Sequence, residues 1–374
     1  MRAPRVRIER RLKQPGHLLV TVPLGSLAVA VLAMALLLVA TSHPPVETFR
    51  KLLDAAFFAD AALTNTLIAA TPLAFTGLAA ALAFRMRLFN IGGEGQLYLG
   101  AIGAAAAALV LGGAPTVVHV LGMVAAGALC GAAWGAIPGV LRAFLNTNEI
   151  ITSLMLNYVA ALMLNYLIFD SLSYWRDTSA TGALFPQGKP FPEEASWPVV
   201  TLGSLLVPLG ALLAVAVAFV VWVLYERTRF GFEAQVIGDS PRAARYAGMR
   251  TRTKIVAVLC LSGALAGIGG ASQDGDFRHV LDARGLQQSN YGYSGIVVAA
   301  MARYNPFAVI LVAFLLGGVQ NAGYSLQGAD FPSGLVGVMQ GLILFCLLGG
   351  EMLVRYRFRL DRSRRPAETV AEPA

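Results

Sequence analysis

The sequence predicts an all-α polytopic membrane protein with about ten transmembrane or re-entrant helices and both termini in the cytoplasm. Composition is the first observation behind this fold class. Of the 374 residues, 56% are hydrophobic and only 13% are charged, against about 25% charged in an ordinary soluble domain. Mean hydropathy is +0.64. A membrane is the environment that such a composition fits.

The second observation is a series of apolar stretches separated by polar segments. A membrane-crossing helix takes about 20 mostly apolar residues, and most of these stretches have about that length. They lie at 18–41, 61–84, 97–112, 116–140, 150–169, 199–225, 255–271, 292–302, 306–319 and 334–353. Each one is expected to be a helix.

The third observation is the distribution of basic residues. When the N-terminus is set in the cytoplasm and the chain changes sides at each stretch, 23 of the 29 lysines and arginines fall on the inner side. This asymmetry is typical of membrane proteins. It predicts a basic cytoplasmic arm over 1–16, a membrane domain over 17–353 with a cytoplasmic loop at 226–254, and a basic, disordered cytoplasmic tail over 354–374. The net charge of +8 then reflects topology, and no nucleic-acid partner is expected.

Two segments leave the count of crossings open. The 11 residues of 292–302 would form only about 16 Å of helix, too little for a hydrocarbon core of about 30 Å. Pro306 breaks the helix between this stretch and the next. The segment 292–319 therefore either crosses twice or forms a re-entrant pair, and the short stretch 97–112 leaves the same choice.

The sequence contains no motif that predicts enzyme activity. The Gly188-Lys189 pair is followed by Pro190 and lacks the glycine-rich lead of a phosphate-binding loop. The three cysteines and four histidines show no ligand spacing. We therefore expect no catalytic residues, no metal site and no cofactor in this chain.

Uncharged amides within and beside the apolar stretches are candidates for a translocation path. Such groups can hydrogen-bond a neutral, hydroxyl-rich solute without bringing a charge into the membrane. Asn157 and Asn165 are eight residues apart, so they can line one side of a helix at two depths. Glu94 could either cap a helix or face the path. The alternative for the whole set is that these residues hold helices together. The candidates are Asn90, Glu94, Gln96, Asn157, Asn165, Gln320 and Asn321.

The loop 226–254 contains a pattern for a short capped helix. Asp239-Ser240 offers an N-cap, Pro241 suits the first helical position, and Gly248 can end the helix. Arg242 and Arg245 would share a face, beside a small surface of Ala243, Ala244 and Tyr246. A helix this short is unstable alone in water. It needs a docking partner, or else it is part of a solvated basic loop.

Three longer stretches resemble a known family: residues 89–101 (FNIGGEGQLYLGA), 147–158 (TNEIITSLMLNY) and 292–306 (GYSGIVVAAMARYNP). They are similar to the membrane-spanning permease subunits of bacterial ABC importers in the branched-chain amino acid and simple-sugar group, and most resemble the nucleoside-uptake permeases. Residues 300–303 depart from the usual pattern, which leaves the side and the role of that turn open. The resemblance implies a bundle like that of type II importers in the bacterial inner membrane.

The same resemblance implies a function and partners. In that family a cytoplasmic helix couples the permease to its ATPase, and residues 238–248 (GDSPRAARYAG) match its pattern. The expected partners are an ATPase subunit carrying ATP and magnesium, a second permease in a heterodimer, an external solute-binding protein and membrane lipid. The expected cargo is nucleoside-like. The alternatives are a permease for a simple sugar or a branched-chain amino acid and, in a different class, an ion-coupled secondary transporter. The lack of ionisable residues deep within the apolar stretches argues against an ion-coupled secondary transporter.

Overall fold

The computed structural model describes residues 5–10, 18–170, 172–179, 182, 186–203, 205–325 and 333–361. The chain divides into two compact units, one built from residues 1–43 and 341–374 and the other from residues 44–340. In the smaller unit, α1 (Leu18–Ala40) is accompanied by the end of α15 (Ser333–Arg355), and β1 (Arg5–Arg10) pairs with β4 (Tyr356–Asp361).

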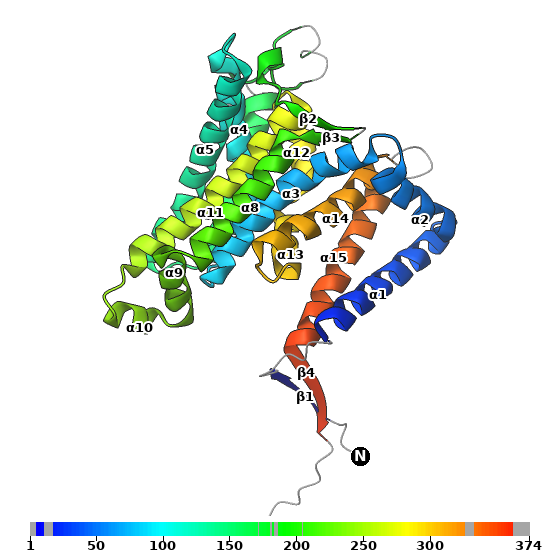
Figure 1. Ribbon diagram of the computed structural model, residues 1–374, viewed down its shortest axis with the longest axis vertical. Coiled ribbons are helices and arrows are strands. Elements are labelled where there is room, and N and C mark those ends of the chain that lie inside the picture. Colours follow the sequence, from blue (N-terminus) through cyan, green and yellow to red (C-terminus); the bar gives the residue numbers. More distant parts are fainter. Residues whose placement is uncertain are drawn as a thin grey trace, which may run out of the picture. The chain divides into compact units, whose positions relative to one another are not determined.

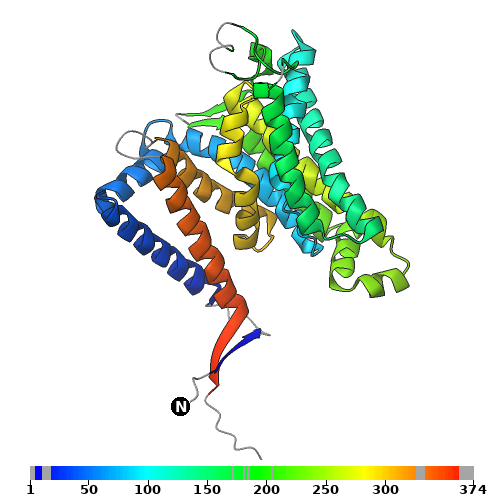
Figure 2. The same ribbon diagram turned by 180° about the vertical axis from the view of Figure 1, so that it is seen from behind.

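The larger unit holds most of the helices (Figures 1 and 2). They are α2 (Pro45–Leu53), α3 (Ala62–Arg85), α4 (Gly93–Leu111), α5 (Thr116–Leu145), α6 (Glu149–Asn165), α8 (Leu209–Glu226), α9 (Arg229–Asp239), α10 (Pro241–Tyr246), α11 (Thr251–Gln273), α12 (Ala283–Ser289), α13 (Tyr291–Met301) and α14 (Pro306–Ser325). The π-helical turns η1 (Asp54–Phe58), η2 (Tyr166–Asp170) and η4 (Asp274–Arg278) and the 3-10 turn η3 (Glu193–Ala195) complete it.

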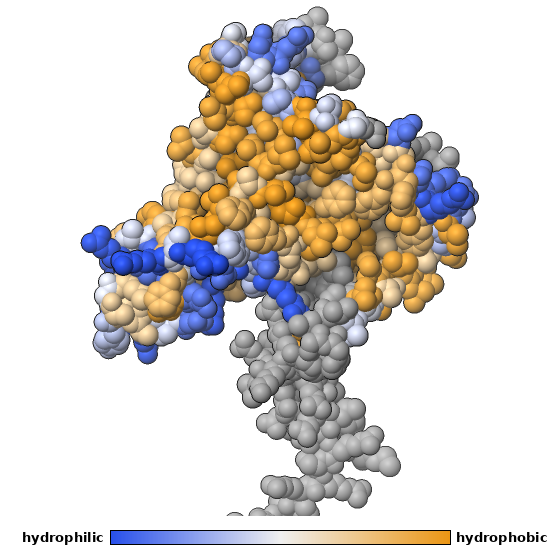
Figure 3. Space-filling model, in the orientation of Figure 1, coloured by the Kyte–Doolittle hydropathy of each residue, from blue (hydrophilic) through white to orange (hydrophobic). Residues whose placement is uncertain are grey.

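Seven helices in the described part of the chain are long and apolar enough to cross a membrane. They are α3, α4, α5, α6 with η2, α8, α11 with η4, and α14. In the space-filling view a broad apolar band lies between two polar ends of the larger unit (Figure 3). Leu129 of α5 and Phe219 of α8 are among its exposed side chains. This is the surface that a multi-pass membrane protein presents to lipid.

The prediction of an all-α chain is wrong in two short segments. Residues 199–208, counted with a helical stretch, form the antiparallel hairpin of β2 (Val199–Leu202) and β3 (Leu205–Pro208), and α8 begins only at Leu209. Pro208 precedes the helix, where its missing N–H costs nothing. The β1–β4 pairing also places residues 356–361 of the expected disordered tail in a strand. The segments before α1 and after α15 contain β-branched and aromatic residues, which favour strands. Residues 362–374 lie outside the described residues.

Small residues set the packing of α5 against α11. Gly127, Gly131 and Gly135 recur every four residues on α5, and a Cβ at any of them would meet the backbone of α11. Gly263 and Gly267 present the matching side of α11. Close approach of backbones lets van der Waals contact hold membrane helices together where no hydrophobic driving force acts.

The larger unit contains two similar arrangements that run in opposite directions. The pattern Asn-x-Gly-x-x-Gly occurs at residues 90–95, at the start of α4, and again at residues 290–295, at the start of α13. Helix α11 packs on α4 and α5, while α3 packs on α13 and α14. Because Ser262 of α11 contacts Ala79 and Gly269 contacts Phe75, α3 and α11 are antiparallel. This is the inverted repeat found in many transporters.

Residues 283–301 form a helix in two pieces. Helix α12 ends at Ser289, Asn290 takes a left-handed conformation with φ of 50°, and α13 continues from Tyr291. Ser289 contacts Tyr324 near the end of α14, whereas the carbonyl of Tyr304 beyond α13 accepts a hydrogen bond from Arg85. Helix α13 alone corresponds to about 16 Å, too short to cross a hydrocarbon core of about 30 Å by itself, as the sequence predicts.

Candidate functional site

The expected short helix in the loop 226–254 is present as α10. Ser240 is its N-cap, and its hydroxyl oxygen accepts a hydrogen bond from the N–H of Ala243 at 3.3 Å. Pro241 occupies the first position, and Gly248 has φ of +76°, the left-handed geometry that ends a helix. The prediction of a capped helix bounded by these residues is confirmed. The preceding helix α9 was not predicted.

Exposure on α10 corrects the expected docking surface. Ala244 has no exposed surface, whereas Tyr246 is 94% exposed. Pro241, Arg242, Ala243 and Arg245 are also exposed. Ala244 faces inward because α10 packs back on α9 and the N–H of Met249 bonds to the Ala244 carbonyl at 3.0 Å. The surface available to a partner is therefore Arg242, Ala243, Arg245 and Tyr246.

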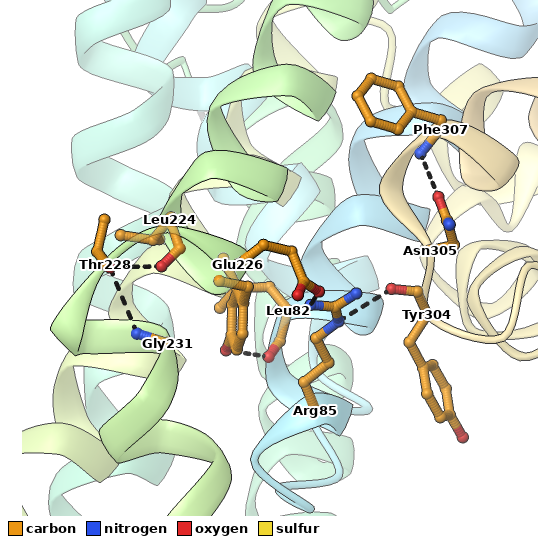
Figure 4. Close-up of polar contacts among 10 residues, drawn as sticks. Leu82, Arg85, Leu224, Glu226, Thr228, Gly231, Tyr304, Asn305 and Phe307 are labelled. Atoms are coloured by element: carbon orange, nitrogen blue, oxygen red, sulfur yellow. Dashed lines mark hydrogen bonds and ion pairs between the residues drawn. The ribbon is translucent and has the colours of Figure 1, made fainter.

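Polar contacts tie this loop to the ends of the membrane helices (Figure 4). Arg85 at the end of α3 forms an ion pair with Glu226 at 2.7 Å and donates to the carbonyl of Tyr304 at 3.2 Å. Next to it, Arg87 forms an ion pair with Asp239 at 2.5 Å. One end of α3 thus meets α8, α9 and the turn before α14, and the turn at residues 302–305 lies at the same end of the unit as the 226–254 loop.

The predicted path residues near α4 meet at the start of α13. The Glu94 carboxylate accepts hydrogen bonds from the N–H of Gly292 at 2.6 Å, the N–H of Tyr293 at 3.2 Å and the hydroxyl of Tyr98 at 2.7 Å. Glu94 is only 2% exposed. It therefore caps a helix, as one of the two interpretations had it, but the capped helix is α13 and not its own.

Asn90 and Gln96 form a second buried group beside Glu94. Asn90 donates to Gln96 at 2.9 Å and to the hydroxyl of Ser262 at 2.8 Å, and its own oxygen accepts from the N–H of Gly92. Both amides are at most 2% exposed. They join the segment before α4 to α11, so here the role of holding helices together is the one that the contacts describe.

Asn157 and Asn165 of α6 both contact protein, and they do so through different elements. Asn157 accepts from the N–H of Gly95 at 2.9 Å and donates to the carbonyl of Ile91 and to the hydroxyl of Tyr293. Asn165 is half-buried and pairs with Gln287 of α12. Through these two residues α6 is joined to both repeats.

Gln320 and Asn321 lie apart from the other candidates, near the far end of α14. Asn321 donates to the carbonyls of Ala55 and Ala62 and to the hydroxyl of Thr66. Gln320 donates to the carbonyl of Ser289 at 3.3 Å. The structure therefore brings together Asn90, Glu94, Gln96 and Asn157, and separates them from Gln320 and Asn321.

The sequence predicts no ionisable residue deep within a stretch apart from Glu94 and Glu351 near segment ends, and Glu94 and Asp274 do lie near the ends of their helices. Glu94 is deeply buried, and so is Asp274, which has no exposed surface and continues α11 beyond its predicted end. This segment was missed because the apolar stretch was ended at residue 271, before the π-helical turn η4. Tyr293 was also missed, although the repeated Asn-x-Gly-x-x-Gly pattern around it could have identified it.

Comparison with known proteins identifies the class. A family model described as the permease component of the branched-chain amino acid transport system matches residues 62–348, which is more than half of the chain. The chain belongs to this family and is a multi-pass membrane permease.

Particular relatives cover nearly the whole chain. The glucose ABC transporter permease protein TsgB13 of Haloferax volcanii is 32% identical over 98% of this chain and 97% of its own length. The guanosine ABC transporter permease protein NupP of Bacillus subtilis is 32% identical over 89% and 93%. The nucleoside ABC transporter permease protein NupB of Lactococcus lactis is 27% identical over 87% and 90%. A second permease from each of the last two organisms, NupQ and NupC, is also similar.

Proposed function

We propose that this chain is the permease subunit of an ATP-driven importer in the bacterial cytoplasmic membrane and forms half of a path for a nucleoside-like solute. ATP and magnesium would be bound by a separate ATPase subunit, and an external binding protein would deliver the solute. The observation that carries the proposal is α10, a capped helix that exposes Tyr246 beside two arginines in a chain of the permease family.

The site supports coupling to an ATPase through its rigidity. A six-residue helix cannot hold its shape alone in water, but α10 is packed on α9 and α9 is fixed by the ion pairs of Arg87 with Asp239 and of Lys254 with Glu233. Movement of Tyr246 by a docked ATPase would therefore be transmitted to the ends of α3 and α11. The proposed coupling residues are Asp239, Ser240, Pro241, Arg242, Ala243, Ala244, Arg245, Tyr246 and Gly248, with Ala244 acting inside the loop.

The nucleoside assignment rests on two relatives, and a sugar is the second candidate. NupP and NupB are named for guanosine and nucleosides, whereas TsgB13, equally identical to this chain as NupP, is named for glucose. A ribose ring and a hexose share adjacent hydroxyl groups, which suit a path of uncharged amides. A branched-chain amino acid would bring two charges.

A second, different permease chain is the proposed partner within the membrane. Bacillus subtilis and Lactococcus lactis each have two relatives of this chain whose names share a solute. That pairing supports a heterodimer, in contact with membrane lipid. We retain the same candidates as proposed path residues: Asn90, Glu94, Gln96, Asn157, Asn165, Gln320 and Asn321. They would act through the helix breaks that they fix as well as through direct contact with the solute.

A charge placed on the exposed face of α10 tests the coupling. Ala243→Asp leaves the helix cap intact, but a docked partner would have to bury an unpaired carboxylate, which costs several kcal/mol. We expect the variant to insert and accumulate normally, to lose co-purification with the ATPase and to lose uptake of labelled nucleoside. Ala244→Asp should instead unfold the loop, because Ala244 is buried within it.

Arg242→Ala removes a charge at the rim of the same surface and should be milder, since exposed charges contribute only about 0–1 kcal/mol. It should keep most of both activities. Wild-type co-purification and uptake by Ala243→Asp would reject the coupling role. Uptake by the purified chain alone in liposomes, driven by an ion gradient, would replace the importer with a secondary transporter.

A further inference from the structure

A cavity of about 500 Å³ lies at the end of the larger unit away from α10. Its wall comes from α3, η4, α12, the first residue of α13 and the end of α14. Small-molecule sites usually measure about 300–1,000 Å³. We call this space the outer cavity; among the residues that line it are Arg278, Asp282, Gln288, Tyr291, Asn321 and Tyr324.

One wall of the outer cavity carries an ion pair with unused bonding capacity. Arg278 donates to the Asp282 carboxylate at 2.6 Å, and the other carboxylate oxygen accepts from the N–H of Gly285 at 2.9 Å. The Nε of Arg278 is buried without a hydrogen-bond partner among the described residues, so a solute in the cavity would use the terminal N–H groups of the guanidinium. A carboxylate has about four acceptor positions and a guanidinium five donors, so both groups can still bind a ligand.

Another part of the wall is aromatic. Tyr291 is buried, whereas Phe277 and Tyr324 are 47% and 41% exposed. The hydroxyl of Tyr324 is hydrogen-bonded to Ser289 at 2.9 Å, which leaves its ring face free for contact. Aromatic faces beside convergent polar groups are typical of sites that bind a flat or ring-shaped polar molecule.

The floor of the outer cavity is the break between α12 and α13. Tyr291 follows the left-handed Asn290, and its carbonyl accepts a hydrogen bond from Thr76 of α3 at 2.9 Å. Irregular backbone at membrane depth persists only where protein or a polar cavity satisfies it. A solute bound here would therefore touch the break between α12 and α13.

We propose that the outer cavity binds the solute through two adjacent hydroxyl groups of its sugar ring. One hydroxyl donates to Asp282 while the neighbouring oxygen accepts from Arg278, and the aromatic wall contacts the ring or base. The charges of Arg278 and Asp282 neutralise each other, so this pair suits a neutral solute, and Arg284, which also lines the cavity, lies over the ring of Phe169. This assignment rests on the proposed importer function and names the residues of this chain that contact the cargo.

Asp282→Asn in the complete importer tests the proposal. Asparagine can keep the bond to Gly285 and is a good helix cap, but it loses the charged acceptor for a hydroxyl pair. In proteoliposomes with the binding protein saturated, we expect guanosine uptake to fall about tenfold. Uptake of 2′-deoxyguanosine, already slow in the wild type, should not fall further, so the preference for the ribonucleoside disappears. Glucose and 2-deoxyglucose form the second pair of solutes, to distinguish a nucleoside from a sugar.

Glu47→Gln is the matched control, because Glu47 forms an equivalent pair with Lys51 on α2 but does not line the cavity. It should leave uptake and solute preference unchanged. Unaltered preference in Asp282→Asn, with normal wild-type uptake, overturns the cavity assignment and leaves the importer intact. If the wild type imports neither pair of solutes, the proposed solute class fails. The cavity is then tested directly by the modification of a Gln288→Cys thiol in the presence of guanosine or glucose. Absence of protection by both compounds rejects the cavity assignment.

Discussion

At the scale of single residues, Glu94 connects the two repeats. The Glu94 carboxylate on α4 accepts hydrogen bonds from the N–H groups of Gly292 and Tyr293 in the first turn of α13, where the positive end of the helix dipole favours a negative charge. The equivalent position in the second repeat is Ser294. The repeats are therefore similar in backbone but differ in the one residue that closes their junction.

Removing this side chain should destabilise the protein. In Glu94→Ala, the N–H groups of Gly292 and Tyr293 and the hydroxyl of Tyr98 lose their acceptor, and each buried unsatisfied group costs about 1–3 kcal/mol. We expect a loss of about 3 kcal/mol or more and a Tm lower by about 5 °C or more, measured by thermal unfolding in detergent. Glu94→Gln should cost less because its amide oxygen still accepts.

Glu194→Ala is the control for this substitution, since Glu194 is exposed at the end of the unit away from α10. Its Tm should equal that of the wild type. A wild-type Tm for Glu94→Ala would show that the junction does not depend on the carboxylate.

At the scale of elements, the contact of α5 with α11 depends on the absence of side chains. A methyl group at Gly131 would overlap the carbonyl of Gly263. Gly131→Ala must therefore push the helices apart, and overpacking of this kind costs about 1–3 kcal/mol. We expect a lower Tm, and weaker packing of α4, which meets the same face of α11 through Gly100.

Gly25→Ala gives the matched comparison within a helix. A Cβ at Gly25 meets nothing within 4 Å, so this change should leave the Tm unchanged or raise it slightly through helix propensity. Equal effects of the two substitutions would mean that helix propensity, and not close packing, explains the glycines.

At the scale of the whole molecule, α11 separates the two polar ends of the larger unit. Lys254 near its start forms an ion pair with Glu233 of α9, and Gly275 just beyond its end accepts a hydrogen bond from the N–H of Trp197. The 21 residue steps from Lys254 to Gly275 span about 32 Å of helix, which is about the thickness of the hydrocarbon core. The segments 226–254 and 170–198 should therefore lie on opposite sides of the membrane.

Cysteine labelling in intact cells checks this arrangement. With Cys130, Cys260 and Cys346 replaced, Glu194→Cys should react with an impermeant maleimide from outside, and Arg245→Cys should react only after lysis. Outside labelling of the second variant would invert the topology.

The sequence alone predicted most of the long apolar helices and the cap of α10, because apolar length, proline and Ser240 act locally along the chain. It missed α9 and the β2–β3 hairpin, and its assignment of the basic residues to one side of the membrane stays a prediction. It did not determine that Ala244 faces inward, that Glu94 caps α13, or that the helix over residues 283–301 breaks at Asn290. Those features depend on contacts between residues far apart in the chain, such as Glu94 with Gly292. Only tertiary packing decides which of several polar partners a buried group meets.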